Sequence, residues 1–204
     1  MSAKTPRVGV IGVGAIGMTH AKAWQANRAT PVAIAELNDA LREKVAGEIG
    51  AIGYRSAETM LAAAELDIVS ICTPPFTHAE LVERAVDAKL AIICEKPLAH
   101  TLEDAERIGR LVSESGTTFT VGFCHRFQPQ IEAMKRMIDD GAIGEPMLFR
   151  NRFAGLKADA ATTWFSNPAL SGGGPMMDTS VHSVDLFRHL VGDPIHVAAL
   201  TSTK

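Results

Sequence analysis

Three glycines near the amino terminus set narrow limits on the architecture of this chain. Gly12, Gly14 and Gly17 fit the pattern G-x-G-x-x-G and follow the apolar run Arg7–Ile11. Between a strand and a helix, such glycines permit a tight turn, close approach of the backbone to a diphosphate, and close helix–strand packing. The pattern predicts a dinucleotide site at the positive end of the helix dipole, the alternative being a glycine-rich turn that binds no ligand. The residues expected to contact the cofactor here are Gly12, Gly14, Ala15, Ile16 and Gly17.

Apolar runs alternate with helical stretches over the first 120 residues. Strands are predicted at Arg7–Ile11, Pro31–Glu36, Ala51–Tyr54, Asp67–Cys72, Leu90–Glu95 and Thr117–Gly122. Helices are predicted at Ala15–Arg28, Asn38–Ile49, Ser56–Ala64, Thr77–Ala88 and Thr101–Ser115. Most of the apolar runs are nearly continuous in Val, Ile, Ala and Leu, which is typical of strands covered by helices on both sheet faces. The alternation therefore predicts an α/β fold, with a doubly wound parallel Rossmann sheet over residues 1–122.

The pattern changes after residue 122, and residues 123–204 are predicted to begin a second domain. Helices are expected at Gln130–Asp140 and Met176–Leu190, and strands at Pro146–Phe153 and Ile195–Thr203. A strand at the end of a chain needs neighbours to satisfy its backbone groups. We therefore expect this α+β substrate domain to be incomplete in the sequence.

Composition and charge exclude several classes of partner. The net charge of −3 is spread without blocks, which gives no electrostatic case for nucleic acid or an anionic membrane. The sequence shows neither a secretory signal nor an apolar stretch long enough to cross a bilayer. Its three widely spaced cysteines indicate buried, reduced thiols. No zinc-ligand spacing is found for His20, His100, His189 and His196. We expect a cytoplasmic protein without a metal.

A carboxylate closes the second apolar run. Glu36 follows Gly17 by 19 residues, which is about where an acid would bind the ribose hydroxyls of a dinucleotide. Leu37 comes next, so no adjacent arginine is ready for a 2′-phosphate. NAD is therefore favoured over NADP, although NADP stays open. The alternative for Glu36 is an ordinary exposed acid at the end of a strand.

Four further motifs follow in order along the chain. They are Cys72-Thr73-Pro74-Pro75-Phe76-Thr77-His78, Glu95-Lys96-Pro97, His125-Arg126-Phe127, and Gly172-Gly173-Gly174 leading into Asp178, His182 and Asp185. Together these motifs resemble the glucose–fructose oxidoreductase / inositol 2-dehydrogenase (Gfo/Idh/MocA) family over nearly the whole chain. The resemblance implies a Rossmann domain, a second domain built on a broad sheet, and hydride transfer with NAD or NADP.

The resemblance implies that Lys96, Asp178 and His182 are catalytic. Lys96 follows a predicted strand at the edge where ligands bind in such sheets, and its ammonium can stabilise a developing alkoxide. Asp178 and His182 are four residues apart on a predicted helix, so they are expected to share one face. Imidazole titrates near neutrality, which suits taking a proton from a substrate hydroxyl. The alternatives are a solvated lysine and a routine surface pair.

Other residues are expected near the cofactor or the junction between the domains. The further cofactor contacts expected are Thr73, Pro74, His78, Glu95, Lys96 and Arg126. His78 could instead be only a helix-end residue, and Arg126 could serve domain packing alone. Trp164 could form a wall of the substrate pocket or belong to a core. Asp185 is expected to support the helix or a neighbouring strand.

The chain departs from the family pattern at two positions and in length. Cys124 stands where the family often has asparagine, and Ser180 where it often has glycine. Family members usually exceed three hundred residues, and the missing sheet normally completes the substrate pocket and the oligomer interface. We therefore expect dinucleotide binding by this chain without robust turnover, and a homo-oligomer only for a longer protein.

The resemblance implies an NAD(P)-dependent oxidoreductase that acts on a secondary alcohol or carbonyl of a sugar-like or polyol substrate. Two other functions stay open at this point. One is a regulatory module that binds dinucleotide without turnover, and the other is a glycosidase that uses bound NAD transiently.

Overall fold

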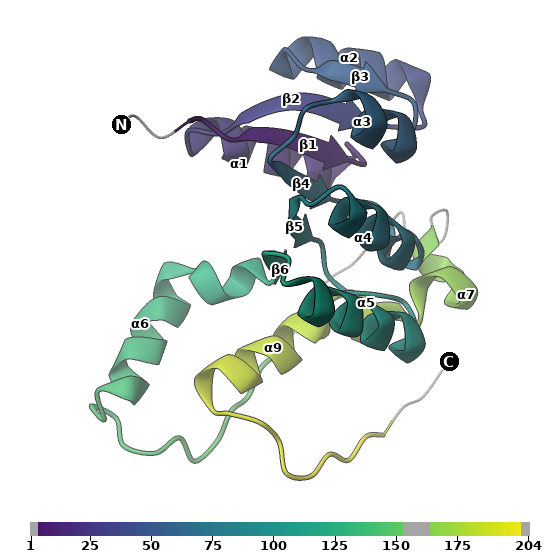
Figure 1. Ribbon diagram of the computed structural model, residues 1–204. Coiled ribbons are helices and arrows are strands. Elements are labelled where there is room, and N and C mark those ends of the chain that lie inside the picture. The colour runs from purple at the N-terminus through teal and green to yellow at the C-terminus, as the bar shows by residue number, and fades with distance from the viewer. Residues whose placement is uncertain (1–3, 153–163, 201–204) are drawn as a thin grey trace.

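A six-stranded parallel sheet forms the centre of the amino-terminal part (Figure 1). The computed structural model describes residues 4–152 and 164–200. The strands are β1 (Arg7–Ile11), β2 (Thr30–Ala35), β3 (Ile52–Tyr54), β4 (Ile68–Ile71), β5 (Ala91–Cys94) and β6 (Phe119–Val121). Their order is β3-β2-β1-β4-β5-β6, so the direction of winding reverses between β1 and β4. Ligands of open α/β sheets bind beyond the carboxyl ends of the strands at such a reversal.

Helices cover both faces of the sheet. They are α1 (Ala15–Ala26), α2 (Asp39–Ile49), α3 (Ala57–Ala63), α4 (His78–Asp87) and α5 (Leu102–Ser115). Successive side chains of a strand point to opposite faces of the sheet and so belong to two separate apolar clusters. In β2, Ala33 and Ala35 pack on one face and Ile34 packs on the other. Members of α3, α4 and α5 complete the first cluster, and members of α1 and α2 complete the second. The expected doubly wound sheet is confirmed, and the predicted ends of these eleven elements differ from the observed ones by at most two residues.

The second part of the described chain is mainly helical. It contains the short helices η2 (Cys124–Phe127), η4 (Trp164–Ser166) and α7 (Pro168–Ser171) and the longer helices α6 (Pro129–Asp139) and α9 (Val181–Leu190), with α8 (Gly174–Asp178) before α9. A further short helix, η1 (Pro75–Thr77), leads into α4. Helix α6 packs against α9. Among the described residues, every helix is too short or too polar to cross a bilayer.

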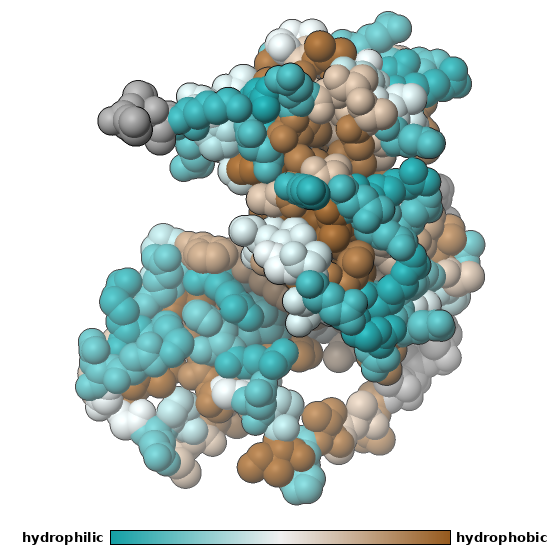
Figure 2. Space-filling view, in the orientation of Figure 1, coloured by the Kyte–Doolittle hydropathy of each residue, from teal (hydrophilic) through white to brown (hydrophobic). Residues whose placement is uncertain are grey.

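The two strands predicted for this part are not formed within the described residues. Residues 146–152 and 195–200 adopt neither strand nor helix, and the ends of both predicted strands lie outside the described residues. Their apolar side chains stay exposed, as at Met147 (94%) and Ile195 (90%). Figure 2 shows apolar residues along the extended carboxyl-terminal segment at the bottom of the view. A strand needs a paired neighbour, and neither segment pairs with a strand of the described residues.

The helix predicted at Met176–Leu190 is interrupted. Helix α8 ends at Asp178 and α9 begins at Val181, and the two residues between them break the regular ladder. At this break the side-chain hydroxyl of Thr179 donates to Asp178 Oδ2 (3.2 Å). The prediction that Asp178 and His182 share one helix face is therefore wrong, because they belong to different helices.

A single atomic contact shows why a glycine is required at the start of α1. A Cβ added to Gly17 would lie 1.9 Å from the carbonyl oxygen of Gly12, which is far inside van der Waals contact. Gly12 itself has a φ of +79°, a left-handed conformation that side chains disfavour. The glycine turn thus sets how closely α1 approaches the end of β1.

We predict that Gly17→Ala lowers the free energy of unfolding by about 1–3 kcal/mol or more, because the new methyl group collides with backbone. Urea denaturation followed by circular dichroism measures this change. The matched control is Gly47→Ala in α2, where an added Cβ meets nothing within 4 Å. That control is expected to stabilise the chain by about 0.5–1 kcal/mol, as alanine does in a helix interior. Equal effects of the two substitutions would contradict the packing described here.

Candidate active site

A cavity of about 900 Å³ lies at the carboxyl-terminal edge of the sheet. Its walls come from the glycine turn after β1, the end of β2, and the loops after β3, β4 and β5, together with Trp164 and Asp178 from the second part of the chain. This volume lies at the upper end of the range for small-molecule and cofactor sites. The cavity thus occupies the position that the reversal of strand order predicts.

The glycine turn fits a diphosphate. Gly12, Gly14, Ala15 and Ile16 line the cavity, and the space where a Cβ of Gly14 would stand is open. The first turn of α1 carries no acidic side chain, so no charge of the helix itself neutralises its positive end. Gly17 does not line the cavity and serves packing instead.

Glu36 lies at the end of β2 and lines the same cavity. Its carboxylate accepts hydrogen bonds from the backbone N–H groups of Val13 (3.1 Å) and Asn38 (3.0 Å). These bonds hold the carboxylate beside the glycine turn, where it could accept hydrogen bonds from ribose hydroxyls.

Arg55 also lines this end of the cavity, and sequence reasoning missed it. It directly follows β3, and β3 pairs in parallel with β2 through Ala35 and Tyr54. Parallel pairing therefore predicts that the residues after both strands lie at one edge. Arg55 therefore places a positive charge near Glu36, whereas Leu37, the residue directly after Glu36, carries none.

Lys96 and Asp178 form an ion pair in the cavity wall. The Lys96 ammonium lies 3.0 Å from Asp178 Oδ1 and donates to the Asp178 carbonyl oxygen at 2.7 Å. Both side chains are about one-fifth exposed. Lys96 follows β5 whereas Asp178 ends α8, so the fold brings together two of the three expected catalytic residues from positions 82 apart.

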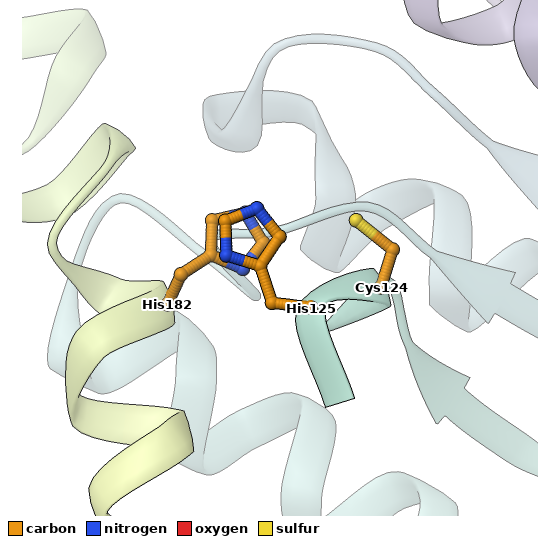
Figure 3. Close-up of side chains that lie close together, drawn as sticks. All are labelled: Cys124, His125 and His182. Carbon is orange, nitrogen blue, oxygen red and sulfur yellow. The ribbon is translucent and has the colours of Figure 1, made fainter. Parts of the chain in front are cut away.

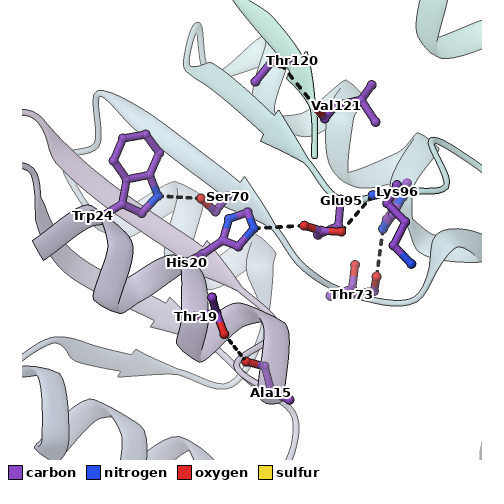
Figure 4. A network of polar contacts seen from close by, with 11 residues as sticks. Ala15, Thr19, His20, Trp24, Ser70, Thr73, Glu95, Lys96, Thr120 and Val121 are labelled. Atoms are coloured by element: carbon purple, nitrogen blue, oxygen red, sulfur yellow. Dashed lines mark hydrogen bonds and ion pairs between the residues drawn. The ribbon is translucent and has the colours of Figure 1, made fainter. Parts of the chain in front are cut away.

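Glu95 is buried next to this lysine and joins three segments. Its carboxylate lies 3.1 Å from Nε2 of His20 in α1 and accepts the backbone N–H of Lys96 at 3.1 Å (Figure 4). A Cβ at Gly122 would lie 2.6 Å from Glu95 Oε1, so the chain after β6 passes directly against it. Glu95 therefore fixes the backbone from which the Lys96 side chain extends. His20 is a second residue that sequence reasoning missed, although it lies one turn beyond Gly17 on α1.

His182 is 6% exposed and stacks on His125 rather than lining the cavity. The ring centroids of the two histidines are 3.9 Å apart and the rings are nearly parallel, as Figure 3 shows. Burial lowers the pKa of His182 to about 4, helped by the positive charges of His125 and Lys96 and opposed by Glu95 and Asp185. His182 is therefore a neutral imidazole near pH 7, able to accept a proton.

His78 has a different role from the expected cofactor contact. Its side chain is fully buried, with Nε2 2.8 Å from the Thr73 carbonyl oxygen and Nδ1 3.1 Å from that of Pro97. Burial lowers the pKa of this imidazole. His78 thus ties the loop after β4 to the loop after β5 from beneath, whereas Thr73 and Pro74 line the cavity above it.

Arg126 pairs with the buried carboxylate of Asp185 instead of lining the cavity. Arg126 Nε lies 2.8 Å from Oδ2 and Nη2 lies 2.5 Å from Oδ1, which is a bidentate arrangement. The pair joins η2 to α9. This geometry favours the domain-packing alternative for Arg126, with Asp185 as its partner carboxylate.

Comparison with known proteins places the chain in a family. Residues 6–123 match the oxidoreductase family with an NAD-binding Rossmann fold (GFO_IDH_MocA), and residues 131–204 match the GFO/IDH/MocA C-terminal domain. The chain belongs to the GFO/IDH/MocA oxidoreductase family.

Several relatives are dehydrogenases of sugars and cyclic polyols. The chain is 36% identical to an inositol 2-dehydrogenase of Rhizobium meliloti, over 96% of this chain and 58% of the relative, and 36% identical to a D-apiose dehydrogenase of Paraburkholderia graminis, over 95% and 52%. A structure of levoglucosan dehydrogenase in complex with NADH and levoglucosan superposes with a TM-score of 0.84 at 28% identity, covering 93% of this chain and 55% of that one. The chain thus spans slightly more than half the length of these relatives.

We predict that the stability of the chain falls between pH 6.5 and about 4 in part because of His182. Its folded pKa lies below the unfolded value of 6.5, so the unfolded state binds the proton first and folding loses free energy as the pH falls. Urea denaturation in metal-free buffer at several pH values measures the slope of the free energy of unfolding against pH. His182→Asn is expected to flatten it, whereas His196→Asn, at an exposed position, leaves it unchanged. Identical slopes for the wild type and His182→Asn would contradict the assigned pKa.

Proposed function

We propose that this chain supplies the cofactor site and part of the substrate site of an oxidoreductase that uses NAD and acts on a secondary alcohol or carbonyl of a sugar-like or polyol substrate. The observation that carries the proposal is the Lys96–Asp178 ion pair, which lies in the wall of the same cavity as the glycine turn and Glu36. The sugar and inositol dehydrogenases among the relatives support this substrate class.

The residues of the cavity suit binding of the dinucleotide. The backbone of Gly12, Gly14 and Ala15 would hold the diphosphate, and Glu36 would accept hydrogen bonds from the ribose hydroxyls. A free carboxylate at this position repels a 2′-phosphate, so NAD is favoured over NADP. The bound nicotinamide supplies the hydride acceptor for the carbon that carries the reacting hydroxyl.

Each of the remaining residues has one chemical task. The Lys96 ammonium stabilises negative charge on the substrate oxygen as its proton leaves, and Asp178 holds that ammonium in place. The proton passes to His182 rather than to Lys96, because a neutral imidazole can accept a proton and an ammonium already holds its own. His182 lies behind the cavity wall, so this transfer requires one bridging water or a rotation of the ring toward the substrate. The alcohol thus loses a hydride and a proton, and a carbonyl group remains.

We predict that Lys96→Ala in the complete gene product lowers kcat by about 10²–10³-fold, because charge on the substrate oxygen is no longer stabilised. His182→Ala is expected to lower kcat by about 10²–10⁴-fold through the loss of the proton acceptor. The measurement is NADH formation with a panel of polyols and sugars. Lys44→Ala, at an exposed position of α2, is the matched control and leaves kcat unchanged.

Wild-type activity in either Lys96→Ala or His182→Ala would contradict the role assigned to that residue. Tight NADH binding without turnover on any substrate would favour a regulatory module instead. Release of a sugar from a glycoside without net NADH accumulation would identify a glycosidase.

We predict that Glu36→Gln weakens NADH binding about 10-fold or more, because charge-assisted hydrogen bonds to the ribose are lost. NADPH binding is expected to weaken less or to strengthen, since a 2′-phosphate no longer meets a carboxylate and Arg55 lies nearby. Calorimetric titration with both cofactors measures the ratio. The control Glu43→Gln, at an exposed position of α2, keeps the wild-type ratio. An unchanged ratio in Glu36→Gln would contradict the ribose assignment.

A further inference from the structure

Three side chains with metal-binding atoms meet beside the cavity. Cys124 Sγ and ring nitrogens of His125 and His182 all lie within 4.8 Å of one another (Figure 3). Cys124 and His125 are neighbours on η2, whereas His182 comes from α9. Cys72 and Cys94 are buried as expected, but the expectation of a buried thiol is wrong for Cys124, which is exposed. The cluster is therefore reachable from solvent.

The hydride-transfer chemistry proposed above has no use for the thiol in this group. A thiolate and two imidazoles are ligands that zinc prefers, and three protein ligands leave a fourth position for water. The cluster is thus a candidate metal site that includes the proposed proton acceptor, His182.

The separations suit a zinc ion after a small movement. Tetrahedral zinc with its usual bond lengths holds such ligand atoms about 3.3–3.7 Å apart, roughly 1–1.5 Å closer than the upper limit of 4.8 Å found here. Stacked imidazoles cannot both aim a lone pair at one ion, so binding requires the His125 ring to tilt out of its stack on His182. His125 is only partly buried on a short helix, which leaves room for that rotation.

The charged residues around the cluster have opposing effects on the binding of a cation. Glu95 and Asp185 lie close enough to influence His182 and favour a cation, whereas Lys96 opposes one. Arg126 is held in its bidentate pair with Asp185 and so offsets part of that carboxylate. Opposing charges of this kind favour reversible binding of zinc over a permanent structural ion.

We propose that Cys124, His125 and His182 form a reversible three-ligand zinc site, and that zinc bound there inhibits the enzyme by occupying the His182 ring. The inhibition rests on the proposed function, because it requires His182 to be the proton acceptor. The metal site itself does not depend on that function.

Titration of the 204-residue chain with Co²⁺, a spectroscopic substitute for zinc, tests the site directly. We expect one equivalent to bind with the absorption bands of a thiolate-bound tetrahedral ion and to be displaced by Zn²⁺. Cys124→Ser and His125→Ala are each expected to weaken binding by at least about 100-fold, because loss of a direct ligand should exceed the 10–100-fold typical of outer-shell changes. His196→Ala is the matched control and retains wild-type binding. Circular dichroism verifies that each variant is folded.

Absence of saturable Co²⁺ binding, or binding that survives Cys124→Ser unchanged, would overturn the site. The inhibition is tested with the complete gene product, in which Zn²⁺ should reduce NADH formation in the wild type and have at least about 10-fold less effect on Cys124→Ser. Equal inhibition of both proteins would overturn the regulatory part. Co²⁺ binding in a protein that shows no dehydrogenase activity would refute the proposed function and leave the site intact.

Discussion

The parallel hydrogen-bond ladder between β1 and β4 is the constraint on which the site depends. Register pairs Ile11 with Ile71, so the two strands end side by side and the chain leaves them in opposite directions around the sheet. The glycine turn and the loop after β4 therefore border one cavity. The apolar clusters on both faces keep the sheet rigid, which lets a few backbone groups and short loops hold the site in place.

Lys96 and Asp178 tie the second part of the chain to that edge. Buried Glu95 fixes the backbone of Lys96, and the Lys96 ammonium forms an ion pair with Asp178 in the cavity wall. The Arg126–Asp185 pair lies within the second part, where it joins η2 to α9 and so helps to position His182. The same arrangement packs His182 against His125. The burial that keeps the His182 ring neutral therefore also places that ring near Cys124.

The Rossmann half could be predicted from sequence because each of its signals is local. Short spans of sequence are enough to predict the strands, the glycine turn and the position of Glu36 at the end of β2. The parallel pairing of β2 with β3 explains in retrospect why Arg55 lies at the same edge. The second half could not, since the strands predicted near Met147 and Ile195 require pairing partners that no short-range pattern supplies. The surroundings of Asp178 and His78 likewise depend on tertiary contacts, since Asp178 is bound by Lys96 from 82 residues away and the His78 ring contacts the Pro97 carbonyl oxygen in the loop after β5.

The central claim is that one cavity holds the dinucleotide with its reactive ring next to Lys96. A crystal structure of the chain bound to NADH tests it most directly. The account predicts electron density for the diphosphate against Gly12, Gly14 and Ala15, with the ribose at Glu36 and the nicotinamide beside the Lys96–Asp178 pair. A dinucleotide bound elsewhere, or one whose nicotinamide points away from Lys96, would contradict it.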